Sequence, residues 1–136
     1  MVAYSFKAQF EEPIATGAKT QTVRGNRARH ARPGEALQLY VAMRTRHCRK
    51  ILTPDPLCID VRSIEIVVAT YHPTIIKQIE IEGIPLSLEE MALFAIADGF
   101  GCEKPGACPL FRMGRFWLST HGEGTFDGVV IRWEPR

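Results

Sequence analysis

The clearest strand of the sequence lies at residues 33–42, which read Pro-Gly-Glu-Ala-Leu-Gln-Leu-Tyr-Val-Ala. Pro-Gly is a turn signal, and the residues after it alternate between apolar and polar side chains. Leu37, Leu39 and Val41 therefore point to one side of an extended chain, while Tyr40 lies on the opposite, more polar side. This pattern predicts a half-buried strand with one face in the core.

Further segments on both sides of this strand are rich in apolar and β-branched residues, which favour extended backbone. We expect the strands to cover residues 2–6, 20–24, 36–42, 47–53, 57–70, 74–81 and 125–133. Helices are expected at residues 10–16 and 109–120, and a third between them opens on a capping box of Ser87 and Glu90. That third helix is expected to end at Asp98-Gly99.

Many short strands with two or three helices predict an α+β fold, namely a small, mostly antiparallel barrel with helices at its mouth and side. The length of 136 residues suits one domain, and no repeat or linker divides it, so residues 1–136 are expected to form a single domain. No apolar run approaches the roughly 20 residues of a membrane span. The amino terminus also lacks the layout of a signal peptide, so a cytoplasmic location is expected.

Charge is divided unevenly along the chain. Residues 1–62 contain 11 Lys and Arg against 5 Asp and Glu, whereas residues 63–136 contain 6 against 10. Such asymmetry favours one face that binds an anionic partner, with phosphate the obvious candidate. Two charged faces that only keep the protein soluble explain the same asymmetry equally well.

The cysteines give no indication of a metal site. Cys48, Cys58, Cys102 and Cys108 contain no closely spaced CxxC pair, so we expect no bound metal and no cofactor. In a cytosolic protein these cysteines are expected to be reduced thiols. Cys102 and Cys108 bracket a loop to which the sequence assigns no role.

The densest group of polar residues lies at residues 17–24, which read Gly-Ala-Lys-Thr-Gln-Thr-Val-Arg. If the chain is extended here, Thr20, Thr22 and Arg24 share one face because side chains alternate. Lys19 lies in the crossing from the preceding helix and can reach the same face. A lysine, a hydroxyl and a guanidinium would then converge, although strand propensity and solvated charges explain the same residues in a purely structural way.

The pattern Gly-x-Lys-x-x-Thr-x-Arg, placed between a short helix and the strand at 36–42, resembles the ASCH family. Residues 39–45, 97–100, 116–117 and 126–133 extend this resemblance over most of the chain. The ASCH family belongs to the superfamily of PUA-like barrels. The resemblance therefore implies a PUA-like β-barrel with a ligand cleft that binds RNA or a nucleotide.

Small bacterial members of that family, similar to this chain, hydrolyse N4-acetylcytidine to cytidine and acetate with a lysine, a threonine and a glutamate. The resemblance implies that Lys19 and Thr22 fill the first two roles and that Glu82 is the glutamate. Glu80 is the alternative if the register slips. Both glutamates belong to an Ile-Glu-Ile-Glu strand, where they can equally be surface carboxylates facing solvent.

The chemistry of this set is consistent with amide hydrolysis. Thr22 can attack the acyl carbon if a neutral Lys19 removes its proton, which requires a lysine pKa lowered by burial or by Arg24. Glu82 can then protonate the exocyclic N4 of the leaving cytidine. We therefore expect a hydrolase that acts on the amide bond of N4-acylcytidine.

Two other functions compete with this expectation: a non-catalytic module that binds RNA or a modified nucleotide, and a ribonuclease. Arg27 and Arg29 favour a longer anionic ligand, and Tyr40 can stack on a base or pack in the barrel. We expect the ligand to contact Thr20, Arg24, Arg27, Arg29 and Tyr40. No pair of histidines is spaced for phosphate-ester cleavage. A nucleoside, a nucleotide or RNA is the expected partner, and the sequence leaves the oligomeric state open.

Overall fold

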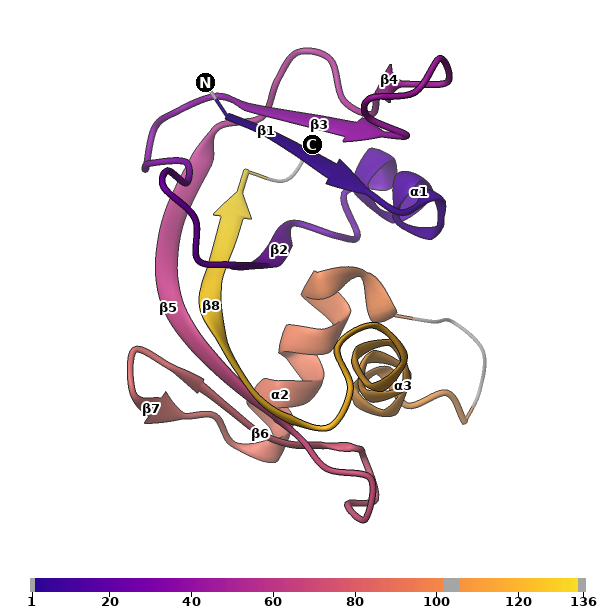
Figure 1. The fold of residues 1–136 in the computed structure, drawn as a ribbon, viewed down its shortest axis with the longest axis vertical. Helices are drawn as coiled ribbons and strands as arrows, with labels where there is room; N and C mark the ends of the chain where they lie inside the picture. Colours follow the sequence, from indigo (N-terminus) through magenta and orange to yellow (C-terminus); the bar gives the residue numbers. More distant parts are fainter. Residues whose placement is uncertain (1, 102–105, 135–136) are drawn as a thin grey trace.

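Two sheets form the β part of the computed structural model, which describes residues 2–101 and 106–134 (Figure 1). The first sheet has the order β1 (Val2–Phe6), β3 (Leu37–Val41), β4 (Arg49–Lys50). The second has the order β2 (Gln21–Gly25), β8 (Gly124–Trp133), β5 (Cys58–Val68), β6 (Ile76–Ile81), β7 (Ile84–Pro85). Neighbouring strands are antiparallel except for the parallel pair β1 and β3.

The α+β class and the mostly antiparallel pairing agree with the prediction from the sequence. An isolated antiparallel bridge between Ala36 and Leu57 joins the edge of β3 to the start of β5. The pairings of the described residues nevertheless give two sheets and do not by themselves show a closed barrel.

The long antiparallel pair of β5 and β8 forms a bent ribbon through the molecule (Figure 1). Its register runs from Cys58 opposite Trp133 to Val68 opposite Gly124, with an irregularity between Cys58 and Asp60. Alternate side chains of these strands enter the core, where Ile66 is fully buried. The concave side of the ribbon holds the helices and thereby forms one wall of the interior.

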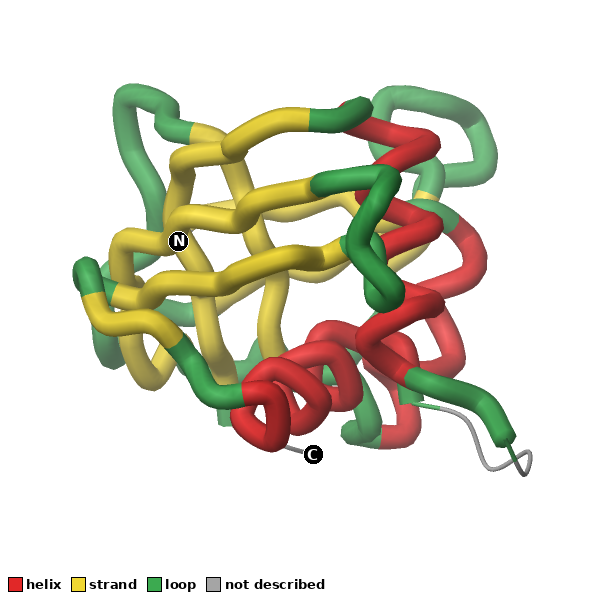
Figure 2. Tube along the Cα trace, turned by 90° about the horizontal axis from the view of Figure 1, so that it is seen from below, coloured by secondary structure: helices red, strands yellow, loops and turns green. Residues whose placement is uncertain are grey.

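The helices gather on one side of the strands (Figure 2). A short 3₁₀ helix, η1 (Ala8–Phe10), leads into α1 (Glu11–Thr16). α2 (Leu88–Ala95) continues into a π-helical turn, η2 (Ile96–Phe100), and α3 (Pro109–His121) packs beside both. No helix of residues 2–101 and 106–134 is long and apolar enough to cross a bilayer.

Local signals in the sequence located several elements correctly. The alternation at 36–42 is confirmed, because Leu37, Leu39 and Val41 are buried. The capping box of Ser87 and Glu90 is also present, with both of its hydrogen bonds formed.

Two differences from the predicted boundaries are the most informative. Of the strand expected at 47–53, only Arg49–Lys50 pairs, and this short edge strand is exposed. The α-helical part of the middle helix ends at Ala95 rather than at Asp98, because the chain widens into the π-helical turn before Gly99 breaks it. This turn matters for the site, since it contains Asp98.

Candidate functional site

Lys19 is held at the crossing from α1 to β2. α1 ends at Gly17, whose φ of 85° is the left-handed conformation that glycine adopts readily. Two backbone hydrogen bonds then fix the crossing, from Lys19 N to Pro13 O (2.9 Å) and from Thr20 N to Ala97 O of η2 (3.0 Å). The side chain of Lys19 lies inside the protein and keeps only 3% of its surface exposed.

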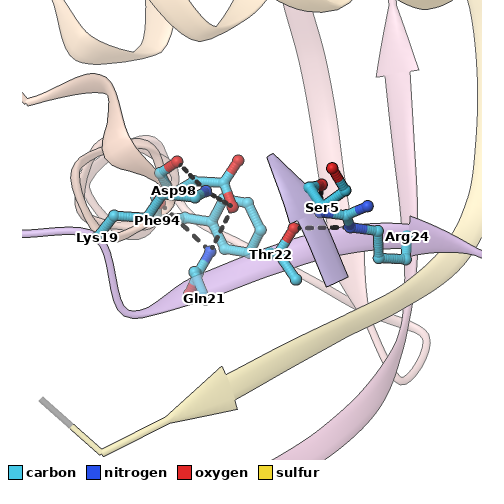
Figure 3. A network of polar contacts seen from close by, with 7 residues as sticks. All are labelled: Ser5, Lys19, Gln21, Thr22, Arg24, Phe94 and Asp98. Atoms are coloured by element: carbon cyan, nitrogen blue, oxygen red, sulfur yellow. Dashed lines mark hydrogen bonds and ion pairs between the residues drawn. The ribbon is translucent and has the colours of Figure 1, made fainter. Parts of the chain in front are cut away.

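The ammonium group of Lys19 lies among aromatic rings and one acidic residue. Its Nζ donates to the backbone carbonyl of Asp98 at 2.5 Å and lies 3.7 Å from the Asp98 carboxylate (Figure 3). The ring centroids of Phe10 and Phe6 are 4.7 and 5.7 Å away. The interpretation of Lys19 as a solvated surface charge is therefore wrong.

Asp98 lies in η2 and keeps 5% of its surface exposed. Gln21 of β2 donates from Nε2 to the Asp98 carboxylate at 3.4 Å and to the carbonyl of Phe94 at 3.5 Å (Figure 3). The backbone turns sharply at Gly99, whose φ is 102°, and a Cβ at that position would come within 2.9 Å of Lys19 Cδ. A glycine is therefore needed where the π-helical turn passes the lysine stem.

Thr22 and Arg24 lie on one face of β2, as alternation predicted. Arg24 donates from Nε to the hydroxyl of Thr22 at 3.0 Å and from Nη2 to the carbonyl of Ser5 at 2.7 Å (Figure 3). The guanidinium also lies 4.8 Å from the ring centroid of Phe6. These contacts fix the oxygen of the buried Thr22 hydroxyl and leave its proton free to be given to a base.

A cavity of about 260 Å³ joins these groups, and we refer to it as the Lys19 cavity. Its polar lining includes Lys19, Thr22, Arg24 and Asp98, and its apolar lining includes Phe6, Phe10, Val23, Phe116, Trp117 and Phe126. Lys7 and His121 also line it, and both are exposed to solvent. Apolar walls with a few convergent polar groups are typical of small-molecule sites.

Burial shifts the pKa values of Lys19 and Asp98 toward their neutral forms. Burial lowers the pKa of Lys19; the nearby charge of Arg24 lowers it further, while the Asp98 carboxylate opposes the shift. Burial raises the pKa of Asp98, and the charge of Lys19 opposes that shift. The arrangement thus places a lysine suited to accept a proton beside a carboxyl group suited to donate one.

His121 adds an imidazole at the exposed side of the Lys19 cavity. Its ring stacks on Trp117 with centroids 4.1 Å apart and meets the edge of Phe126 at 5.3 Å. Burial against these rings lowers the pKa of His121, and the nearby Lys7 adds to the effect.

Two predicted ligand contacts lie outside the Lys19 cavity. Thr20 uses its backbone N–H for η2 and its carbonyl for Trp133, and its side chain is not part of the cavity lining. Tyr40 projects from β3 in the other sheet, where the ammonium of Lys50 lies 5.9 Å from its ring centroid. The structure therefore does not bring Thr20 or Tyr40 together with Lys19 and Thr22.

The two predicted arginine contacts are engaged within the protein. Arg27 donates to the carbonyl of Arg29 at 2.8 Å and lies 4.6 Å from the ring centroid of Tyr4. Arg29 forms an ion pair with Glu35. Both arginines are exposed in the loop after β2, outside the lining of the Lys19 cavity.

Glu82 and Glu80 occupy a different part of the molecule. Glu82 is exposed in the turn after β6 with a φ of 53°, and both glutamates line a second cavity of about 160 Å³. Its lining, which we refer to as the acidic hollow, is Ser63, Ile64, Glu65, Glu80, Glu82, Gly83 and Asp127. Neither glutamate lines the Lys19 cavity, so the expected Lys-Thr-Glu set is not assembled there.

Sequence reasoning missed Asp98, the carboxylate that does meet Lys19. It treated Asp98-Gly99-Phe100 as an ordinary helix stop, because an Asp before a Gly commonly ends a helix. Asp98 follows Lys19 by 79 positions, so only the packing of η2 on the crossing before β2 brings them together. The one signal in the sequence for the burial of Asp98 is its position directly after the apolar residues of the helix.

Other parts of the described chain lack a comparable constellation. A cavity of about 580 Å³ near α1 has Glu12 as the only ionisable residue of its lining among the residues that the structure describes. No cluster of three or more potential metal-binding side chains occurs among the described residues. Cys58 is buried, Cys48 is exposed, and Cys102 falls outside the described residues.

Comparison of the chain with protein-family models, with curated proteins and with solved structures finds no match.

Proposed function

We propose that this protein is a cytoplasmic hydrolase that removes acyl groups from N4 of cytidine-type nucleosides, and that its fold is a PUA-like barrel of the ASCH type. The observation that carries the proposal is the buried pair of Lys19 and Asp98 in one cavity with the anchored hydroxyl of Thr22. The sequence pattern from Gly17 to Arg24 adds the family resemblance. Neither the substrate nor the reaction needs a cofactor.

Thr22 is the nucleophile in this proposal. Its hydroxyl oxygen accepts a hydrogen bond from Arg24 Nε, and the neutral amine of Lys19, which lines the same cavity, is the base that takes its proton in this proposal. Attack on the acyl carbon forms the bond to Thr22 Oγ1 and a tetrahedral oxyanion. The guanidinium of Arg24, already beside the hydroxyl, is the nearest positive charge to stabilise that oxyanion.

Asp98 takes the acid role that the resemblance gave to Glu82. The carbon–N4 bond breaks as the amine takes the carboxyl proton of Asp98, and the raised pKa of Asp98 favours this protonated form. Water then hydrolyses the acyl ester of Thr22 and releases the carboxylic acid. Lys19 has gained the proton of Thr22 and Asp98 has lost its proton to N4, so the number of protons on these groups is accounted for.

The aromatic lining suits the planar base of such a substrate. Phe116, Trp117 and Phe126 supply apolar ring surface opposite the polar groups of β2. A pyrimidine can pack against these rings while its N4 acyl group reaches Thr22. The cavity of about 260 Å³ is of the size that a base with a small acyl group needs, and it is open at the side of Lys7 and His121.

A spectrophotometric assay with N4-acetylcytidine tests the proposal. Wild type should release cytidine, and Lys19→Ala, Thr22→Ala and Asp98→Asn should each lose about 10²- to 10⁴-fold in kcat/KM while remaining folded by circular dichroism. Glu82→Gln is the matched control, because it removes an exposed carboxylate of the acidic hollow. Inert wild type across several N4-acyl groups would contradict the proposal, and loss of activity in Glu82→Gln would restore the glutamate to the acid role.

One observation favours a second candidate function, a non-catalytic site for a nucleotide or RNA. The lining of the Lys19 cavity includes three cations, Lys7, Lys19 and Arg24, against the single carboxylate of Asp98. An anionic ligand would balance that excess. Under this alternative a nucleotide binds with a strong dependence on salt, and acylated cytidines are left unchanged.

A further inference from the structure

Two residues of the Lys19 cavity take no part in the reaction proposed above, and both lie at its mouth. Lys7 follows β1 directly and His121 is the last residue of α3; both are exposed and line the cavity. The carbonyl of Lys7 accepts a hydrogen bond from Phe10 N at 3.0 Å, which anchors its backbone beside the cavity. Its ammonium lies 5.5 Å from the ring centroid of Phe116, so the charge lies at the edge of the aromatic lining.

Lys7 supplies the charge of this mouth, because His121 favours its neutral form. The Nδ1 of His121 lies 2.8 Å from the hydroxyl oxygen of Thr120, and that hydroxyl donates its own proton to the carbonyl of Phe116 at 2.8 Å. Nδ1 therefore carries a proton, which the Thr120 oxygen accepts. Burial lowers the pKa of His121 and the charge of Lys7 lowers it further, which favours the ring with this proton alone. The imidazole thus adds flat ring surface beside Trp117 rather than a second charge.

The charge of Lys7 has no carboxylate to balance it at the mouth. Lys7 forms no ion pair with another residue that the structure describes. Asp98 is the one carboxylate among the described residues that line the cavity, and it lies at the buried end, 3.7 Å from Lys19 Nζ. An exposed cation beside an apolar cavity attracts the anionic end of a ligand that enters there.

Further positive charge lies at the same edge of the first sheet. β1 and β3 are parallel, with Phe6 opposite Val41, so the segments that follow the two strands leave at one edge. Lys7 begins the first of these segments, and the second carries the exposed Arg44 and Arg46. Neither arginine forms an ion pair within the described part of the chain. This edge therefore favours the approach of an anionic ligand to the mouth.

We propose that the mouth of the Lys19 cavity is a phosphate subsite, and that the substrate is a nucleoside 5′-phosphate whose phosphate group binds Lys7. The identity of the base rests on the proposed function. In a pyrimidine the ring nitrogen that carries the sugar lies opposite N4, so a base with its acyl group at Thr22 directs its sugar toward the mouth. A flat apolar part against aromatic walls and a phosphate on a lysine are the two halves of a nucleotide. An uncharged nucleoside would leave Lys7 without a partner.

Isothermal titration calorimetry of the full chain with cytidine 5′-monophosphate and with cytidine tests this subsite. The two ligands share the base and the sugar, so the ratio of their dissociation constants isolates the contribution of the phosphate. Wild type should bind the monophosphate about 10-fold more tightly at low salt, as expected for one hydrogen bond between charged groups. The ratio should shrink as salt is added, because Lys7 is exposed and its charge is screened.

Variants at Lys7 should change this ratio according to their charge. Lys7→Gln should bring it close to one, Lys7→Glu should reverse it, and Lys7→Arg should retain most of it because the positive charge is kept. Lys77→Gln is the matched control and should retain the wild-type ratio. Lys77 is likewise an exposed lysine, but it lies on β6, where its ammonium donates to the hydroxyl of Tyr71 at 2.9 Å.

Equal affinities of wild type for the two ligands, or a ratio that Lys7→Gln leaves unchanged, would overturn the subsite. Hydrolysis assays separate this inference from the proposed reaction. Hydrolysis of N4-acetylcytidine by a protein without preference for the monophosphate would overturn the subsite and leave the reaction standing. A preference that depends on Lys7, with no hydrolysis of N4-acetylcytidine or of its 5′-monophosphate, would support the subsite and overturn the reaction.

Discussion

The Lys19 cavity and the acidic hollow both collect ionisable side chains, but their surroundings give those side chains opposite behaviour. In the Lys19 cavity a lysine and an aspartate are buried together among aromatic rings. In the acidic hollow Glu65, Glu80 and Asp127 have the same charge and lie close to solvent. The family resemblance placed the catalytic acid in the second region, by matching the sequence register to Glu82. The region suited to proton transfer is therefore distinguished by the burial of a basic group beside an acidic one, and not by the number of acidic residues.

The largest difference between the two regions should appear when one carboxylate is removed from each. Asp98→Ala leaves the buried amine of Lys19 without its carboxylate partner, so we expect the free energy of unfolding to fall by about 3 to 5 kcal/mol. Glu82→Ala removes an exposed side chain and should change it by less than about 0.5 kcal/mol. Urea unfolding followed by circular dichroism measures both.

The double variant Lys19→Met/Asp98→Leu serves as the control for this experiment. It removes both buried polar groups and keeps apolar volume, so it should recover part of the stability lost in Asp98→Ala. Equal losses in Asp98→Ala and Glu82→Ala would show that the Lys19–Asp98 pair is not the buried unit described above.

Sequence signals within a few residues of one another predicted much of the fold. The alternation of Leu37, Leu39 and Val41 depends only on the two-residue period of a strand, and the Ser87 capping box depends on a spacing of three. The segment at 47–53 was harder because its basic residues have no apolar partner strand to pack on. Only Arg49–Lys50 pairs with β3 there.

The candidate site was predictable only in part, since half of it lies on one strand. Thr22 and Arg24 are two residues apart, so alternation placed them together correctly. Asp98 reaches Lys19 through the π-helical turn of η2, and no local pattern announces that turn. The assignment of Glu82 relied on matching register through a family resemblance. The exposed turn after β6 shows why such a match cannot substitute for tertiary packing.

Two glycines allow a further comparison, because Gly99 lies beside Lys19 and Gly83 lines the acidic hollow. Gly99 and Gly83 both have left-handed backbone, with φ of 102° and 78°, so alanine at either position strains the chain by about 1 kcal/mol. Only at Gly99 does a Cβ meet another side chain, with Lys19 Cδ at 2.9 Å. We expect Gly99→Ala to cost a further 1 to 3 kcal/mol, roughly, through overpacking, and to reduce hydrolysis of N4-acetylcytidine. Gly83→Ala should retain full activity, and equal effects of the two variants would contradict the placement of Lys19.

The dependence of stability on pH tests the environment of Lys19 without any substrate. The pKa of Lys19 is lowered in the folded protein. At pH values between that pKa and the ordinary value of 10.5, the unfolded chain therefore binds more protons than the folded protein. The free energy of unfolding should rise with pH in this window. The slope is at most about 1.4 kcal/mol per pH unit for one proton. Arg24→Gln removes a charge that lowers this pKa, so the window should narrow and the total rise should shrink. Arg27→Gln is the control, because Arg27 lies in the exposed loop, and it should leave the rise in stability unchanged. If the stability of wild type does not rise with pH in this window, Lys19 titrates normally.

The smallest expected effect belongs to the acidic hollow. The pKa of Glu65 is raised, first by partial burial and then by the negative charges of Asp127 and Glu80. Asp127→Asn should therefore lower the pKa of Glu65 toward 4.5, as measured by the NMR titration of its side-chain carboxyl carbon. Because the native chain holds this proton longer than the unfolded chain, stability falls as pH rises from 4.5 through the raised pKa, and the variant should reduce that fall. Salt should weaken the effect of the substitution, since these carboxylates lie near solvent and their repulsion is screened. If Asp127→Asn leaves the pKa of Glu65 unchanged, burial alone raises that pKa. The two regions would then differ in solvent exposure and not in the sign of the neighbouring charge.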